Sequence, residues 1–361
     1  MIKRRETRLV KVGGVKVGGG APVSIQSMTK VETSDVNAVA SQIKRMKSAG
    51  CDIARVAVKT IKDAQAIRYI KRKIKIPLVA DIHFDYRLAL ESIKSGVDKI
   101  RINPGNMKKR EEIAQVVSAA KKAKIPIRIG VNSGSIFTQY AIRLPAGKAG
   151  NTHDVHADIF VKSAIGYVKI FEELDFHDII ISLKASDVSR TVNAYREISR
   201  LCDYPLHLGV TASGPYDLGI VKSSIGIGAL LLDGIGDTIR VSLTADPVEE
   251  VIAAKRILSS LNLRKFGPEI LSCPTCGRCQ VNLVEIVKEL EDELSAISFQ
   301  PSAKKNITIA VMGCEVNGPG EAKEADIGIA FGKGSGMLFK KGKVIKKVSV
   351  NNAIEALLKS L

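Results

Sequence analysis

The stretch Ile53-Ala54-Arg55-Val56-Ala57-Val58 decides the fold, because it is one of a series of short β-rich runs. The runs occupy residues 23–28, 53–58, 78–84, 99–103, 127–132, 179–184, 206–211 and 238–243. Polar or glycine-rich residues follow each run, and then usually a pattern of helical period, as in 39–46. Eight alternations of strand and helix in about 245 residues predict an α/β fold, a (β/α)8 TIM-type barrel, with a doubly wound sheet as the alternative.

The composition fits such a barrel. A chain of 361 residues suits one large domain plus a smaller one. Hydrophobic residues make up 45%, aromatic residues only 4%, and there is no Trp, so the core is built from Val, Ile, Leu and Ala, as in parallel sheets covered by helices. No run of 18 apolar residues predicts a membrane span, and the start Met1-Ile2-Lys3-Arg4-Arg5 has no apolar signal segment, so we expect a cytoplasmic protein.

The net charge of +18 predicts an anionic partner, which charge alone leaves open between nucleic acid, an acidic protein and a phosphorylated substrate. Much of the charge follows helix-like segments, where it is solvated. The informative charges are those at the carboxyl ends of the predicted strands, where barrels bind their ligands. Where two such residues belong to one strand, they are spaced two or four residues apart and therefore share one face of it. The residues are Arg55, Asp81, His83, Arg101, Asn103, Arg128, Asn132, Ser182, Lys184, His207, Thr211, Arg240 and Ser242.

Four arginines and a lysine at one barrel mouth repel one another unless an anion neutralises them, and guanidinium groups suit phosphate oxygens. The pattern therefore predicts a pocket for a diphosphate. The alternative, that each cation points outward or pairs with a helix carboxylate, is reasonable for one residue but strained for five.

The cysteines of the last quarter predict a metal site. Cys273-Pro274-Thr275-Cys276 places two thiols in a tight turn, and a third, Cys314, follows in a distant loop. On spacing alone, structural zinc and an iron-sulfur cluster remain equally open. Cys51 and Cys202 lie in apolar contexts and are interpreted as packing thiols.

The Gly267-Pro268 break predicts a domain boundary, with a barrel over 1–264 and a smaller α+β metal domain over 265–361. In the second domain we expect strands at 269–272, 307–312 and 327–331, a hairpin near 340–348, and helices near 283–294 and from 351 onward. The long interval 133–176, which includes His153-Asp154-Val155-His156, is interpreted as a mobile insertion at the ligand face.

Several motifs together resemble one family. They are Gln26-Ser27-Met28-Thr29, Arg55-Val56-Ala57-Val58, Ala80-Asp81-Ile82-His83-Phe84, Arg101-Ile102-Asn103-Pro104-Gly105-Asn106, Arg128-Ile129-Gly130-Val131-Asn132, Gly236-Asp237-Thr238-Ile239-Arg240-Val241-Ser242, the CPTCGR run from Cys273 and the MGCxVNGPGE run from Met312. Their order and spacing resemble 4-hydroxy-3-methylbut-2-en-1-yl diphosphate synthases over nearly the whole chain. The resemblance implies reductive opening and dehydration of 2-C-methyl-D-erythritol 2,4-cyclodiphosphate, with electrons from ferredoxin or flavodoxin, in isoprenoid biosynthesis.

The resemblance also implies a 4Fe-4S cluster held by Cys273, Cys276, Cys314 and Glu321, and a head-to-tail homodimer. A carboxylate ligand makes chemical sense, because it can yield an iron site to a substrate oxygen. The substrate-binding residues that it implies are Arg55, Arg101, Arg128, Asn132, Lys184, Arg240 and Ser242. Asp81, His83, Asn103 and His207 are expected as their neighbours. Cys279 departs from the family pattern and is interpreted as a spectator close to the cluster.

A second departure concerns proton transfer. Where the family reads Thr-Glu-Ala-Gly, this chain reads Thr211-Ala212-Ser213-Gly214, and Ala212 cannot transfer a proton. We expect either that Asp217 or Asp81 substitutes for the missing carboxyl, or that turnover is slow.

A rival from another class is a basic nucleic-acid-binding protein with a zinc ribbon. It is weakened by the scarcity of aromatic residues, which stacking on bases requires. A barrel enzyme related to dihydropteroate synthases would share the first domain only.

Overall fold

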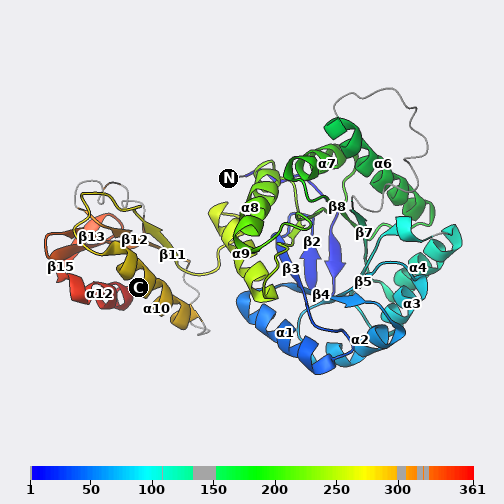
Figure 1. The fold of residues 1–361 in the computed structure, drawn as a ribbon, viewed down its shortest axis with the longest axis horizontal. Coiled ribbons are helices and arrows are strands. Elements are labelled where there is room, and N and C mark those ends of the chain that lie inside the picture. The colour runs from blue at the N-terminus through cyan, green and yellow to red at the C-terminus, as the bar shows by residue number, and fades with distance from the viewer. Residues whose placement is uncertain (1, 108, 133–151, 299–305, 315–319, 321–324) are drawn as a thin grey trace. The chain divides into compact units, whose positions relative to one another are not determined.

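The structure, a computed structural model, describes residues 2–107, 109–132, 152–298, 306–314, 320 and 325–361. The chain divides into two compact units, Met1–Arg264 and Lys265–Leu361 (Figure 1). Within the described residues, no helix combines the length and the apolar character that a membrane crossing needs.

The first unit is a parallel barrel. Its strands are β3 (Ser24–Met28), β4 (Ile53–Val58), β5 (Leu78–Ile82), β6 (Lys99–Ile102), β7 (Ile127–Asn132), β8 (Ile179–Lys184), β9 (His207–Leu208) and β10 (Thr238–Ile239). They pair in the order β8-β7-β6-β5-β4-β3-β10-β9, and a parallel bridge between Ile181 and Leu206 brings β8 to the β9 end of the ring. The predicted barrel is thus confirmed, although the last two strands are shorter than expected.

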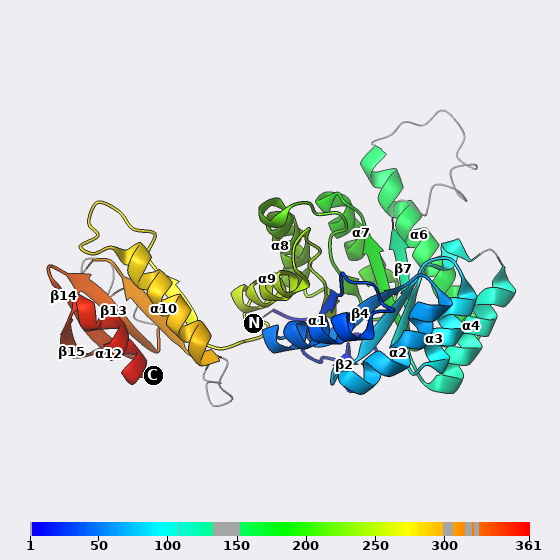
Figure 2. The same cartoon turned by 60° about the horizontal axis from the view of Figure 1, so that its bottom comes forward.

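Helices follow the strands and surround the barrel (Figure 1, Figure 2). They are α1 (Val36–Ala49), α2 (Ile61–Lys73), α3 (Tyr86–Lys94), α4 (Arg110–Ala123), α6 (Thr152–Glu173), α7 (Val188–Leu201), α8 (Tyr216–Leu232) and α9 (Pro247–Ser260). Local sequence fixes several of their starts. Thr60 and Asp63 form a reciprocal capping box at α2, and the carboxylates of Asp35 and Asp187 accept backbone N–H groups at α1 and α7. Each cap satisfies donors that a helix start leaves without partners.

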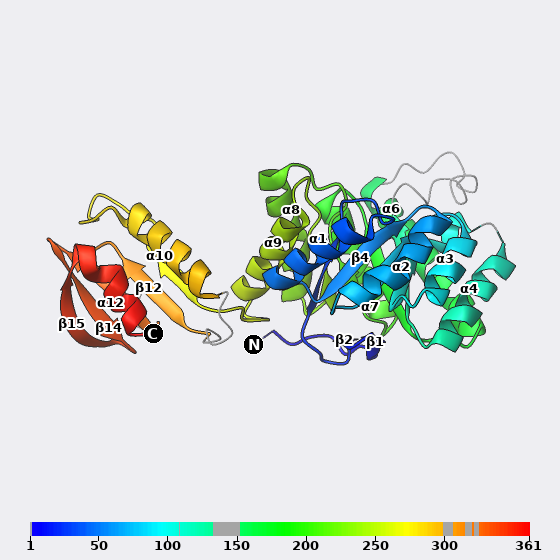
Figure 3. The same ribbon diagram turned by 90° about the horizontal axis from the view of Figure 1, so that it is seen from below.

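A short hairpin closes the amino-terminal end of the barrel. Strands β1 (Val10–Val12) and β2 (Val15–Val17) pair antiparallel at one end of the barrel (Figure 3). Their valines pack on Ile53, Val79 and Ile180. The sequence interpretation missed this hairpin. The hairpin valines therefore fill the amino-terminal end of the barrel.

The interpretation of 133–176 as a mobile insertion was wrong for 152–173, which form helix α6. Phe160, Ala164, Val168 and Phe171 recur at helical spacing and are buried, so the segment belongs to the barrel wall. Residues 133–151 and the side chains of 152–159, which include His153 and His156, lie outside the described part.

In its described residues, the second unit has a five-stranded mixed sheet packed against helices α10 (Leu283–Ser298) and α12 (Ala353–Lys359). The strands are β11 (Glu269–Ser272), β12 (Thr308–Met312), β13 (Ile327–Gly332), β14 (Ser335–Lys340) and β15 (Lys343–Ser349), in sequential order. The first three run parallel, and β13, β14 and β15 form an antiparallel meander. Helices α10 and α12 contribute Leu290 and Leu357 to its buried core.

Candidate anion pocket and cysteine site

Alternate residues of each barrel strand face the interior, and this alternation gathers the predicted cations. On β6, Lys99 and Arg101 share a face, and Arg101 lies in register with Arg128 of β7 on one side and with Asp81 of β5 on the other. The cations of the barrel interior and its carboxyl-end rim are Arg55, Lys99, Arg101, Arg128, Lys184 and Arg240. Five are buried, and the side chain of Arg240 is 16% exposed.

Asp81 is the carboxylate at the centre of this group. Its Oδ1 accepts from Arg101 Nη1 at 3.0 Å, and its Oδ2 lies 3.7 Å from Arg55 Nε and 3.5 Å from His83 Nε2. Burial alone would raise the pKa of Asp81, but Arg55 and the hydrogen bond to His83 outweigh it and hold the pKa well below its usual value. Asp81 is therefore ionised and forms ion pairs with the guanidinium groups of Arg55 and Arg101.

A second buried carboxylate, Glu250 of α9, lies at the other side of the barrel rim. It is 1% exposed, accepts from Ser27 Oγ at 2.9 Å and from Leu243 N at 3.1 Å, and lies 3.5 Å from Arg240 Nη2. Its Oε1 also lies 3.2 Å from Lys30 Nζ. The sequence interpretation missed Glu250, because a helix residue gives no strand-end signal.

Two glycines make room for the cations. A Cβ on Gly130 would lie 2.3 Å from Arg101 Nε, and a Cβ on Gly209 would lie 2.6 Å from Lys184 Nζ. Both long side chains therefore lie across the backbone of the next strand. Glycine at these positions lets two cations approach the barrel interior side by side.

The positive charge is only partly compensated. In the described part of the barrel interior, these six cations have ion pairs with two carboxylates, Asp81 and Glu250. Three of the six have buried nitrogens without a hydrogen-bond partner: Nε of Arg101, Nε and Nη1 of Arg128, and Nε of Arg240. Burial, then the charges of Arg55 and Arg101, hold the pKa of Arg128 well below its usual value. Burial, then Arg128 and Arg240, do the same for the pKa of Lys184. Buried donors without acceptors are costly, and an anion with several oxygens satisfies them.

The remaining predicted residues lie around this pocket. His207 is fully buried, with Nδ1 3.4 Å from Thr238 Oγ1 and Nε2 without a partner. Burial, then Arg128 and Lys184, hold its pKa well below the usual value, so the imidazole is neutral. Asn103 is buried and its Oδ1 accepts from Gly105 N at 3.2 Å. Ser242 follows β10, and its carbonyl accepts from Ser213 Oγ. Asn132 ends β7, but its side chain lies outside the described part.

The two carboxyls expected to replace the missing family glutamate are in different environments. Ala212 has a left-handed backbone, with φ of 49°, and is exposed after β9. Asp217 is exposed in the first turn of α8, five residues further along the chain. Unlike the buried Asp81, Asp217 is exposed to solvent.

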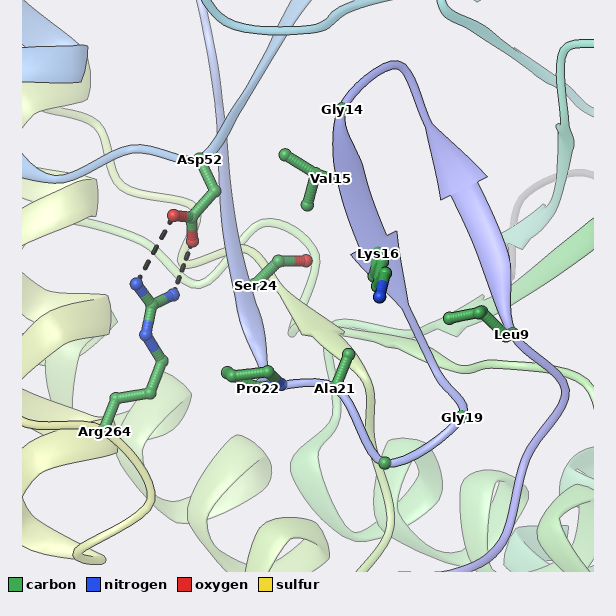
Figure 4. A pocket seen from close by; sticks show the side chains of 11 residues that line it. Leu9, Gly14, Val15, Lys16, Gly19, Ala21, Pro22, Ser24, Asp52 and Arg264 are labelled. Atoms are coloured by element: carbon green, nitrogen blue, oxygen red, sulfur yellow. Dashed lines mark hydrogen bonds and ion pairs between the residues drawn. The ribbon is translucent and has the colours of Figure 1, made fainter.

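A cavity of about 600 Å³ lies at the opposite, amino-terminal side of the barrel. Figure 4 shows the hairpin glycines, Lys16 and Ser24 along its wall and the ion pair between Asp52 and Arg264, at 2.5 Å, on its other side. It contains none of the interior arginines, so it is separate from the anion pocket.

The second unit brings two cysteine loops together. Strands β11 and β12 are parallel neighbours, and Cys273 and Cys314 follow their carboxyl ends. Gly313 N donates to Cys273 Sγ at 3.3 Å, and Gln280 N donates to Gly313 O at 2.9 Å. Cys279 packs against Gly313, because a Cβ there would lie 2.4 Å from Cys279 Sγ.

These residues fit a thiolate-bound cluster. Cys276 is exposed, Cys273 and Cys314 are partly exposed, and a backbone N–H already points at a sulfur, as in cluster sites where such bonds tune the potential. Within the described residues, no three His, Cys, Asp or Glu side chains yet lie close enough to hold a metal ion, and Glu321 lies outside that part. The candidate metal ligands in the described residues are therefore cysteine sulfurs on two adjacent loops.

A parallel barrel with a buried polyanion pocket, joined to a cysteine-bearing α+β unit, defines a class of two-domain enzymes that act on phosphorylated substrates. Residues 7–255 match the GcpE TIM-barrel domain, and residues 269–361 match the GcpE protein C-terminal domain. The chain belongs to the GcpE family, and the resemblance identified in the sequence is confirmed.

Full-length relatives agree with the domain matches. The 4-hydroxy-3-methylbut-2-en-1-yl diphosphate synthase (flavodoxin) of Thermodesulfovibrio yellowstonii is 54% identical, covering 100% of this chain and 99% of that protein. The protein of the same name from Clostridium perfringens is 55% identical, covering 99% of both. A structure of Plasmodium falciparum HPPK-DHPS matches with a TM-score of 0.50 at 11% identity, covering 71% of this chain and 49% of that one, which shows the barrel fold alone.

Proposed function

We propose that this protein reductively opens and dehydrates 2-C-methyl-D-erythritol 2,4-cyclodiphosphate, giving (E)-4-hydroxy-3-methylbut-2-enyl diphosphate. In the balanced reaction two electrons and two protons enter, the carbon–oxygen bond that closes the ring breaks, and one hydroxyl leaves as water. The observation that carries the proposal is the buried excess of cations at the barrel mouth, in a chain whose full-length relatives bear this enzyme's name. The reaction makes the protein an oxidoreductase of isoprenoid biosynthesis.

The barrel unit, 1–264, binds the cyclic diphosphate. Arg101 and Arg128 supply donors that are unsatisfied in the protein alone, and Arg55, Lys184 and Arg240 complete the positive lining. A diphosphate carries its charge on several oxygens, and so meets several guanidinium groups at once. Asn103 and Ser242, which follow β6 and β10, hold the neutral part of the substrate together with Asn132 and His207. The grip on both phosphates keeps the ring oriented when its bond breaks.

The second unit, 265–361, holds a 4Fe-4S cluster through Cys273, Cys276, Cys314 and Glu321. When bound, the cluster supplies the electrons for reduction. The described contacts support the assignment, since Gly313 N already donates to Cys273 Sγ and the loop of Cys314 lies beside it. Cys279 packs against Gly313 and donates to Val281 O, and is therefore a neighbour and not a ligand.

Proton delivery falls to a residue other than Ala212. Asp81 is held ionised by Arg55 and Arg101, so its role is to orient guanidinium groups and to accept a proton once the substrate alters the local charge. Asp217, exposed at the start of α8, is the carboxyl that exchanges protons with solvent. Replacing Asp217 by Asn separates these roles, because turnover falls only if Asp217 donates.

The electron donor is flavodoxin, which the names of the relatives include, or a ferredoxin. The protein acts in the cytoplasm. The strongly basic chain attracts an acidic donor by electrostatic steering. The active form is a head-to-tail homodimer. An exposed apolar row on α8, formed by Leu218, Val221, Ile225 and Leu232, supports a contact with a second copy.

The test is anaerobic reconstitution with iron and sulfide, followed by incubation with the cyclic diphosphate and a chemical reductant. Broad absorption at the blue end of the visible spectrum and formation of the linear diphosphate are expected. Colourless protein that binds zinc and nucleic acid would instead establish the zinc-ribbon alternative. Turnover and substrate binding are then measured for Asp217→Asn and Asp81→Asn, with binding measured in the absence of reductant. A variant that binds normally but turns over slowly has lost proton transfer.

A further inference from the structure

The barrel interior also holds Lys99, a buried cation to which the proposed function gives no role. Lys99 begins β6, two residues before Arg101 on the same face of the strand, and is fully buried. The hydrogen bond described for its Nζ goes to Gln26 Oε1, at a long 3.4 Å. No carboxylate pairs with this ammonium in the described contacts, in contrast to Arg55 and Arg101, which share Asp81.

The groups that face Lys99 come from four strands. Gln26 lies on β3, Arg55 on β4, Arg128 on β7 and His207 on β9. Two of these are cations, one is a neutral amide and one is a neutral imidazole, so none offers negative charge. Gln26 Nε2 and His207 Nε2 also have no hydrogen-bond partner. An ammonium in this position is desolvated and repelled by two guanidinium groups, with one long hydrogen bond to compensate.

We propose that Lys99 is a neutral amine in the free protein and takes up one proton when the diphosphate binds, making it a positioning residue for the arginines above it. The inference rests on the proposed function for the identity of the anion. A polyanion over Arg101 and Arg128 reverses the sign of the field at Lys99. The amine then accepts a proton, and the new ammonium offsets part of the negative charge brought into the barrel.

Burial, then the charges of Arg128 and Arg55, agree with this assignment by holding the pKa of Lys99 well below its usual value. Lys184 shares this lowering, but it lies at the carboxyl end of β8, where the anion contacts it directly. The direction of the pH dependence follows because ligand binding and protonation of Lys99 are linked. Since binding takes up a proton, affinity falls with rising pH, by at most tenfold per pH unit, between the pKa of Lys99 in the free protein and in the complex.

The test is calorimetric titration of the oxidised full-length holoprotein with the cyclic diphosphate, without reductant, in buffers of different ionisation enthalpy. Both phosphates of this ligand are strongly acidic, so the ligand itself does not titrate between pH 7 and 9, and net uptake reports on the protein. We expect Lys99→Met to lower the number of protons taken up by about one while retaining binding. Lys30→Met is the matched control, because Lys30 already contacts Glu250 and should leave proton uptake unchanged.

The outcomes separate this inference from the proposed function. Wild-type binding without net proton uptake, or uptake that Lys99→Met retains, overturns the inference while the function stands. P1,P2-dimethyl diphosphate serves as a second probe with the same two acidic groups. If it binds with proton uptake and the cyclic compound does not bind, the proposed function fails and the role of Lys99 stands; binding of neither refutes both. Should Lys99→Met fail to fold, Lys99→Gln replaces it: a drop of about one in the number of protons taken up supports the inference, and uptake equal to that of the wild type refutes it.

Discussion

Replacing Gly130 by Ala tests the placement of Arg101 in the anion pocket. The added Cβ would lie 2.3 Å from Arg101 Nε, 2.8 Å from Nη2 and 2.9 Å from Cζ. Since carbon atoms pack at about 3.5–4.0 Å, the guanidinium must retreat by more than about 1 Å. The three nearest atoms all belong to the end of one side chain, so the backbone need not move and the barrel should still fold.

The expected loss is one charge-assisted hydrogen bond to the diphosphate, worth about 1.5–3 kcal/mol. At about 1.4 kcal/mol per tenfold, affinity for the cyclic diphosphate should fall roughly 10- to 100-fold. Calorimetric titration of oxidised protein without reductant measures it. Gly166→Ala in α6 is the control, because a Cβ there meets nothing within 4 Å. Binding by Gly130→Ala within twofold of wild type would refute the assignment of Arg101 to the anion.

Three further outcomes follow from the same contacts. Arg128→Met removes a buried cation with two unpartnered nitrogens, so it should raise the free energy of unfolding by about 1–2 kcal/mol in urea melts while weakening diphosphate binding about 100-fold. Asp81→Asn leaves Arg55 and Arg101 uncompensated and should lower the free energy of unfolding by about 3 kcal/mol at pH 7. Because the pKa of folded Asp81 is depressed, its stabilisation is present above about pH 4, the usual unfolded value, and is lost as pH falls through the folded pKa; the variant should lack this acid dependence. Cys276→Ser should lose the cluster and Cys279→Ser keep it, as iron and sulfide analysis of anaerobic protein will show, and the reverse result would reject the ligand assignment.

The sequence predicted the barrel because strand period and helix period alternate regularly, and hydrogen-bonded register then aligns residues of equal parity. Arg55, Asp81 and Arg101 could be placed together on that basis, and the structure joins them by direct contacts. Lys99 was within reach of the same rule, since it precedes Arg101 by two residues. It was overlooked because it lies at the start of β6, whereas ligand-binding residues were expected at the carboxyl ends of the strands.

Other features depend on packing between distant segments, for which the local sequence carries little information. Glu250 reaches Ser27 and Arg240 only because α9 lies beside β3. The hairpin Val10–Val17 gave an alternating signal too short to stand out, although three of its valines pack in the barrel end. The glycines before 152 outweighed the apolar spacing of Phe160 and Phe171, and so concealed α6.

The central claim is that a cluster of arginine and lysine side chains with too few carboxylate partners binds a cyclic diphosphate, which an iron-sulfur cluster held by cysteines reduces. The most direct measurement is product analysis after anaerobic incubation of iron-loaded protein with 2-C-methyl-D-erythritol 2,4-cyclodiphosphate and a low-potential dye. The account predicts one linear hydroxymethylbutenyl diphosphate for every two electrons consumed. Iron-loaded protein that leaves the cyclic compound intact under these conditions would contradict it.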